Sequence, residues 1–279
     1  MALRVPSVGG MKVVSNSGTV GTSTPGTSVP DGASVNTYGT VTEVISAANN
    51  LYGADAIEIM VSNVLNPSAL VGEMSLDILI GGATDDVLIS SLLVGGSYYG
   101  NVGRGYWFPL SIPSGVRIAA QISAGAAQTS EPRVLVNLYK WGVPPFRTGR
   151  KVTTYGTKTN NSRGVAVTPG ASGAARTATQ ITASTSEDHF YFIPGFQVST
   201  DTTIANATFV NVAIGFGAAT EEASDQTWWF SKNASEMQSG PWPTWGEWRN
   251  VPSGTRLTIL ASNGSANDTA QDALIYAVS

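Results

Sequence analysis

The chain has 279 residues, of which 42% are hydrophobic and 12% are charged; it contains no cysteine, and its formal net charge is −4. This length and hydrophobic content suit one large or two ordinary globular domains and exclude a wholly disordered chain. The acidic balance argues against a general nucleic-acid binder, and the lack of cysteine excludes disulfides and thiolate metal sites. The 31 glycines, together with abundant Thr and Val, are typical of an all-β protein with many strands and turns.

No apolar run reaches the roughly 18 residues that a membrane-spanning helix needs, so we expect no membrane insertion. The opening sequence MALRVPSVGG lacks the apolar core of a signal peptide, and we therefore expect synthesis in a cytoplasm.

Residues 1–35 are rich in Gly, Ser, Thr and Pro and have little to bury, which predicts an extended N-terminal arm. An arm of this kind is held in place when it adds main-chain hydrogen bonds to the sheet edge of a neighbouring subunit. The arm therefore predicts a component that assembles in symmetric copies with itself and with other proteins.

A repeated heptapeptide organises the remaining chain. IPSGVRI occupies 112–118 and VPSGTRL occupies 251–257, and each leads into alternating apolar and polar residues. Pro-Ser-Gly is turn chemistry, and alternation with a period of two predicts a half-buried strand. Each copy is therefore interpreted as a tight turn that enters a core strand, with Arg117 and Arg256 facing outward at matching places.

Four further pairs of segments recur in the same order. They are TYGT at 37–40 and 154–157, AIEIMVS at 56 and FYFIPGFQVS at 190, LDILIGGATDD at 76 and VNVAIGFGAATEE at 210, and VLVNLYKWG at 134 and ALIYAVS at 273. Five matches in one order indicate a tandem duplication, although strands rich in Gly and Thr also resemble one another by composition alone.

The predicted organisation is an arm at 1–35, a first β domain at 36–142, a linker at 143–151 and a second β domain at 152–279. Pro144 and Pro145 make the linker stiff and extended. Many short strands separated by turns predict that each domain is a β-sandwich of jelly-roll type.

Little in the sequence points to catalysis, so we expect a protein that is not an enzyme and has no cofactor. His189 is the only histidine, and no G-x-S-x-G motif accompanies it; we interpret it as a partly exposed residue at a strand end. The acidic pairs are interpreted as solvated turn residues rather than as a glycosidase pair or a Ca²⁺ site; they are Asp85–Asp86, Glu187–Asp188 and Glu221–Glu222.

Aromatic residues precede the Pro-Ser-Gly turn in both copies and are the candidate contact residues. In the second copy they are Trp228, Trp229, Trp242, Trp245 and Trp248, which are five of the seven tryptophans. In the first copy they are Tyr98, Tyr99, Tyr106 and Trp107, followed by Phe108. Exposed aromatic side chains can stack on sugar rings or anchor a protein interface, and they can also cap the open end of a sandwich.

The whole pattern resembles bacteriophage virion structural proteins. It is carried by the Cys-free, acidic, Gly- and Thr-rich tandem sandwiches with an arm, and by the phrase FPLSIPSGVRIAAQISA at 108–124, which is similar to phage tail and surface proteins. The resemblance implies a structural or adhesive part of a virion that is assembled in the host cytoplasm.

Three functions remain open. The first is a structural protein of the tail, collar or fibre, and the second is a capsid decoration protein that uses the same arm. The third is a carbohydrate-binding module or lectin that binds a glycan, for example one on the host surface, through its Trp-rich loops. A concave, exposed arrangement of Trp242, Trp245 and Trp248 favours the third, and an arm held by neighbouring chains favours the first two.

Overall fold

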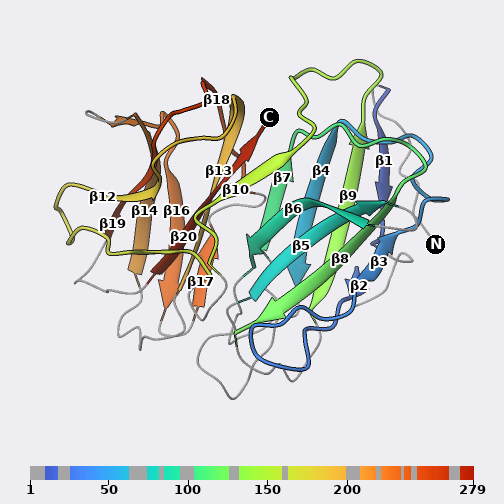
Figure 1. The fold of residues 1–279 in the computed structure, drawn as a ribbon, viewed down its shortest axis with the longest axis horizontal. Helices are drawn as coiled ribbons and strands as arrows, with labels where there is room; N and C mark the ends of the chain where they lie inside the picture. The colour runs from blue at the N-terminus through green and yellow to red at the C-terminus, as the bar shows by residue number, and fades with distance from the viewer. Residues whose placement is uncertain are drawn as a thin grey trace.

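The computed structural model describes residues 10–17, 26–62, 74–81, 85–94, 104–125, 132–158, 163–198, 208–217, 221–233, 236–239, 244–263 and 271–279. These residues form strands and connecting turns, with no helix among them, so the predicted all-β fold is confirmed. The strands lie in two halves, side by side, with the N-terminal half in blue and green and the C-terminal half in yellow to red (Figure 1).

The first half contains two antiparallel sheets. One has the order β1 (Lys12–Ser15), β9 (Arg133–Lys140), β4 (Ala56–Ser62) and β7 (Arg104–Phe108), with β2 (Thr27–Ser28) also paired to β9. The other has the order β3 (Thr42–Ile45), β8 (Arg117–Ala124), β5 (Met74–Gly81) and β6 (Asp85–Leu93). Apolar residues of both sheets share one core, and the strand order is that of a jelly-roll sandwich.

The second half repeats this arrangement. One sheet has the order β10 (Val152–Tyr155), β20 (Gln271–Val278), β13 (His189–Val198) and β18 (Glu247–Val251), with β11 (Val165–Val167) paired to β20. The other has the order β12 (Thr177–Thr182), β19 (Leu257–Asn263), β14 (Thr208–Phe216), β16 (Trp228–Asn233) and β17 (Glu236–Ser239), with β15 (Glu222–Ala223) paired to β14. The repeated sequences at 112–118 and 251–257 precede the equivalent strands β8 and β19.

The repeated turn has the same local structure in both halves. Gly115 and Gly254 have positive φ angles of 73° and 86°, which glycine adopts without a steric penalty. Arg117 pairs with Asp85, and Arg256 pairs with Glu221 at 3.0 Å. Each arginine therefore contacts an acid that follows the equivalent strand, β5 or β14, as the predicted register requires.

One of the five sequence matches does not agree with the topology. Tyr38 of the first TYGT lies beside Ser123 of β8, whereas Tyr155 of the second belongs to β10 and pairs with β20. The strand equivalent to β10 in the first half is β1, because each is the outer neighbour of β9 or β20. The TYGT match is thus a similarity of composition.

The structure corrects the extended arm for the part of residues 1–35 that it describes. Strand β1 pairs with β9 from Lys12 to Ser15, and β2 pairs with the same strand. Val14 and Val29 are buried in the core of the first half. These residues complete the first sandwich, because a few valines within a polar segment are enough to form edge strands, so the sandwich begins before residue 36.

The two halves share an apolar contact surface. The face of β10, β13 and β20 that points away from the second core packs on the first half, where Tyr191, Leu274 and Tyr276 join the first core. The alternate residues of β20, such as Ile275, belong to the second core. All eight residues of β20 are therefore buried, and the strand contributes alternate side chains to both cores.

Candidate functional site: an aromatic pocket between the two halves

A pocket of about 390 Å³ lies where the outer face of the β1-β9-β4-β7 sheet meets the second half. It is lined by Met11, Glu58, Trp107, Tyr139, Trp141, Phe146, Trp245 and Trp248. Six of these eight side chains are aromatic, and one is a carboxylate.

Strand alternation places the floor of the pocket. In β4, Ile57 and Ile59 point into the core, so Glu58 between them points to the outer face. The neighbouring strands pair Glu58 with Trp107 of β7 on one side and with Asn137 of β9 on the other. The carboxylate thus lies between an indole ring and polar side chains on three adjacent strands.

The second half supplies the exposed wall. The ring centroids of Trp107 and Trp245 are 5.0 Å apart, and those of Trp107 and Trp248 are 6.5 Å apart. Trp107 is 6% exposed, whereas Trp245 is 50% and Trp248 is 47% exposed. Trp107 therefore supports two indole rings that keep about half of their surface open to solvent.

The linker closes the opposite side. Phe146 packs edge-on against Trp107 and against Trp141, at centroid distances of 5.1 Å and 5.0 Å. Trp141 stacks on Tyr139 of β9 at 5.9 Å. Each ring is held by at least one other ring, so the pocket is formed without a ligand.

One carboxylate oxygen of Glu58 accepts hydrogen bonds from neighbouring side chains, and the other has no donor among the described residues. Its Oε2 accepts hydrogen bonds from the Tyr139 hydroxyl at 2.5 Å and from Asn137 Nδ2 at 2.8 Å. Burial, together with this hydrogen bond to Glu58, raises the pKa of Tyr139 above its ordinary value, so the phenol remains a donor. Among the described residues no group donates to Glu58 Oε1, which leaves that oxygen as an acceptor for a ligand hydroxyl.

The predicted contact residues separate into four groups. Trp107, Trp245 and Trp248 meet in the pocket. Tyr106 and Trp228 are buried instead, with the Tyr106 hydroxyl bonded to the Leu93 carbonyl at 2.5 Å and with Trp228 in the second core. Trp229 is 55% exposed on another face, and Trp242, Tyr98 and Tyr99 lie outside the described residues.

Sequence reasoning missed Glu58, Tyr139, Trp141 and Phe146. Glu58 carries a signal, because a single acid within the apolar strand AIEIMVS must face away from the core. Trp141 and Phe146 flank the linker, where their type indicates burial or contact, but nothing local shows which partners they meet.

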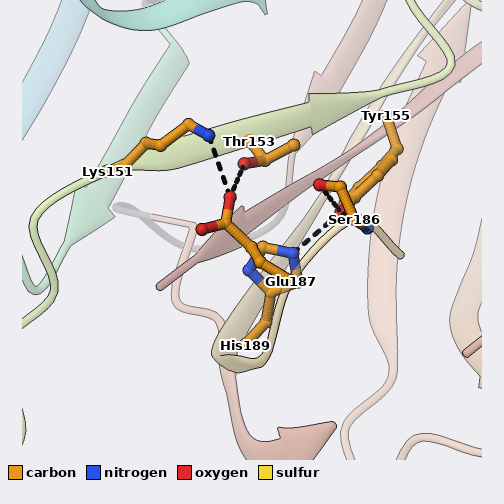
Figure 2. A network of polar contacts seen from close by, with 6 residues as sticks. All are labelled: Lys151, Thr153, Tyr155, Ser186, Glu187 and His189. Atoms are coloured by element: carbon orange, nitrogen blue, oxygen red, sulfur yellow. Dashed lines mark hydrogen bonds and ion pairs between the residues drawn. The ribbon is translucent and has the colours of Figure 1, made fainter. Parts of the chain in front are cut away.

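The only histidine belongs to a buried polar network at the start of β13 rather than to the pocket (Figure 2). His189 is 2% exposed, and its Nε2 lies 2.8 Å from the Tyr155 hydroxyl, which is 3.1 Å from Ser186 Oγ. The expected partial exposure is therefore wrong, because Tyr155 of β10 lies over the ring. Burial lowers the pKa of His189 below its ordinary value.

Four acids of the predicted turn pairs form ion pairs with basic residues; they are Asp85, Glu187, Glu221 and Glu222. Asp188 instead accepts a hydrogen bond from the Ser253 amide. Glu187 Oε1 accepts hydrogen bonds from Lys151 Nζ at 2.9 Å and from Thr153 Oγ1 at 2.8 Å (Figure 2), and Glu222 pairs with Arg249 at 2.5 Å. Within the described ranges, no three His, Cys, Asp or Glu side chains lie together as metal ligands would, and no helix is long and apolar enough to cross a membrane.

Comparison with known proteins finds similarity at the level of structure only. No protein-family model matches the sequence, and no curated protein matches it significantly. A cryo-EM structure of Broad Bean Stain Virus has a TM-score of 0.34 at 10% identity, covering 90% of this chain and 86% of the viral chain.

Two bacterial structures are similar to the same degree. PNGase F, a glycosylasparaginase from Flavobacterium meningosepticum, has a TM-score of 0.37 at 9% identity and covers 96% of both chains. The tandem CBM22 domains of Paenibacillus barcinonensis Xyn10C have a TM-score of 0.31 at 12% identity, with 99% of this chain and 92% of that one covered. At these scores the function must be argued from the pocket itself.

Proposed function

We propose that this protein is a non-enzymatic carbohydrate-binding component of a bacteriophage virion and that the aromatic pocket is its binding site. The single observation that carries the binding function is the exposed pair Trp245 and Trp248 beside the carboxylate of Glu58. A sugar ring has an apolar face of C–H groups and a rim of hydroxyls, and the pocket offers one surface for each.

The chemistry of binding follows from this arrangement. The C–H face of a sugar packs on the open indole rings, and a hydroxyl donates a hydrogen bond to Glu58 Oε1. Because Trp107, Phe146 and Tyr139 hold these groups in place, little conformational entropy is lost when the ligand binds.

The residues that line the pocket favour binding of a carbohydrate without its hydrolysis. Most glycosidases place two carboxyl groups about 5–10 Å apart on either side of the bond that they cleave. Glu58 is the one carboxylate among the residues that line the pocket. We expect incubation with a bound oligosaccharide to release no new reducing ends.

The place in a virion is supported by the resemblance of the repeated strands to phage tail and surface proteins. The described parts of residues 1–35 pair within their own chain, so they add no support for contacts with neighbouring copies. A tail, collar or fibre position is proposed first, and capsid decoration is the alternative. Antibody labelling of purified particles in the electron microscope distinguishes the two.

Binding is tested by titrating a panel of neutral oligosaccharides into the protein by isothermal titration calorimetry. We expect one class of glycan to bind, and we expect Trp248→Ala and Glu58→Gln to weaken its binding. Leu51→Ala is the control, because it removes a similarly exposed apolar side chain that does not line the pocket. If the panel fails to bind, or if Trp248→Ala binds as the unaltered protein does, the pocket is not a glycan site.

A further inference from the structure

A second concave surface lies on the second half, away from the aromatic pocket. Its volume is about 610 Å³, and it lies on the outer face of the sheet that contains β12, β19, β14 and β16. Its lining includes Arg176, Phe209, Asn211, Trp229 and Ser262.

The alternation of side chains along the strands again determines which residues face this surface. In β14 and β16 the side chains of Val210, Val212, Trp228 and Phe230 enter the second core, which leaves the residues between them facing outward. Asn211 pairs directly with Trp229 on one side and with Ser262 on the other. Trp229 is 55% exposed and Phe209 is 58% exposed, so two aromatic rings flank a polar strip.

Arg176 is held over this strip by neutral partners. Its Nε donates to Asn211 Oδ1 at 2.6 Å, and its Nη2 donates to Thr227 Oγ1 at 3.0 Å. Within the described residues no carboxylate forms an ion pair with Arg176, whereas Arg117 and Arg256 each contact an acid. These hydrogen bonds fix the orientation of the guanidinium group, and its positive charge can pair with an anionic ligand.

We propose that this surface is a second binding site and that its ligand is a sugar carrying a carboxylate or phosphate group. The anion pairs with the guanidinium of Arg176, whose planar group of donors matches both kinds of anion. The sugar ring packs against Trp229 or Phe209. This site goes beyond the proposed function, because it shares no residue with the aromatic pocket and selects for charge.

The test compares three small ligands by isothermal titration calorimetry at low salt. A galacturonic acid trisaccharide supplies carboxylates, a glycerol phosphate trimer supplies phosphates, and a galactose trisaccharide is the neutral control. We expect at least one acidic ligand to bind and, in Trp248→Ala, where the aromatic pocket is impaired, the neutral sugar to bind at least about tenfold more weakly. The tighter of the two acidic ligands identifies the anion.

Variants assign the binding to this surface. Arg176→Gln and Trp229→Ala should weaken the acidic ligand by roughly tenfold to a hundredfold. Arg147→Gln removes the same charge elsewhere, and Trp248→Ala damages only the aromatic pocket; both should bind the acidic ligand normally. Thermal unfolding of each variant shows that it is folded.

Three results overturn this proposal: neither acidic ligand binds, the neutral sugar binds Trp248→Ala as tightly as the acidic ligand does, or Arg176→Gln leaves the affinity unchanged. Loss of acidic binding in Trp248→Ala alone would assign that ligand to the aromatic pocket instead. Because the two sites are altered by different variants, the failure of one leaves the other to be judged separately.

Discussion

Trp107 of β7 and Trp245, which precedes β18, lie with their ring centroids 5.0 Å apart although they belong to different halves of the chain. The contact is supported by main-chain bonds, since the Thr244 amide donates to the Gly105 carbonyl at 3.0 Å. The aromatic pocket is therefore assembled only when the two sandwiches are docked.

The two tryptophans should respond differently to truncation. Trp245→Ala should weaken carbohydrate binding by about tenfold while lowering the free energy of unfolding by only about 1 kcal/mol, because half of the ring is exposed. Trp107→Ala should also lower the free energy of unfolding by about 3–5 kcal/mol, because that ring is buried. Urea unfolding measures the loss of stability, and calorimetric titration measures the loss of binding. Equal losses of stability in the two variants would contradict the interpretation that Trp107 is a buried support and Trp245 an exposed contact residue.

The repeated arginines should have similar effects on stability. Arg117→Ala and Arg256→Ala each remove an ion pair whose arginine side chain is 28% or 27% exposed. A loss of roughly 1 kcal/mol in the free energy of unfolding is expected for each, with additive effects in the double variant. Urea unfolding of the single and double variants checks this; a strongly non-additive result would show that the two sites are coupled.

The sequence predicts the fold well because each copy of the repeat contains local patterns, namely a turn sequence and the alternation of apolar and polar residues. The turn at 112–118 and the turn at 251–257 specify their own backbone conformation, and the alternation in the strands specifies which face is buried. The strands at Lys12–Ser15 and Thr27–Ser28 were missed because a short edge strand needs few apolar residues and is stabilised by a partner far along the chain.

The site is predicted only in part, for a related physical reason. The aromatic loops draw attention to Trp107, Trp245 and Trp248, but their meeting depends on how one sandwich docks on the other. The same docking brings Glu58 and Tyr139 beside the indoles of the second half. Contacts between separate elements of this kind leave no periodic signal in either segment.

The docking of the two halves depends on a buried hydroxyl. Tyr276 of β20 accepts a hydrogen bond from the Leu93 amide at 2.8 Å and donates one to the Ser91 carbonyl at 3.0 Å. Tyr276→Phe keeps the ring but removes both bonds, so the free energy of unfolding should fall by about 1–3 kcal/mol in urea unfolding. Tyr155→Phe, whose hydroxyl contacts Ser186 and His189 within the second half, is the comparison for a buried hydroxyl that does not join the halves.

A change in carbohydrate affinity distinguishes these two tyrosine variants. Tyr276→Phe should also weaken the affinity, because a looser junction separates Trp107 from Trp245. Tyr155→Phe should lower the free energy of unfolding and leave the carbohydrate affinity unchanged. Equal affinities in the two variants would mean that the pocket does not depend on this junction.

The buried His189 should make stability depend on pH in a narrow range. Burial lowers the pKa of the folded imidazole below its ordinary value of 6.5, partly opposed by the charge of Glu187. The unfolded chain then binds a proton more readily than the folded one, so stability is full above about pH 6.5 and falls as the pH drops below it. The slope approaches at most about 1.4 kcal/mol per pH unit for one proton.

Urea unfolding between pH 8 and pH 5 measures this dependence, and His189→Gln is the variant that isolates it. Glutamine offers a polar partner to the Tyr155 hydroxyl but does not titrate, so the decline between about pH 6.5 and 5 should disappear. Glu187 acts in a separate range, because its ion pair with Lys151 lowers its pKa below the ordinary value of 4.5. Its contribution is therefore lost only as the pH falls below about 4.5, in both proteins. An unchanged slope in His189→Gln would assign the loss of stability near pH 6 to another group.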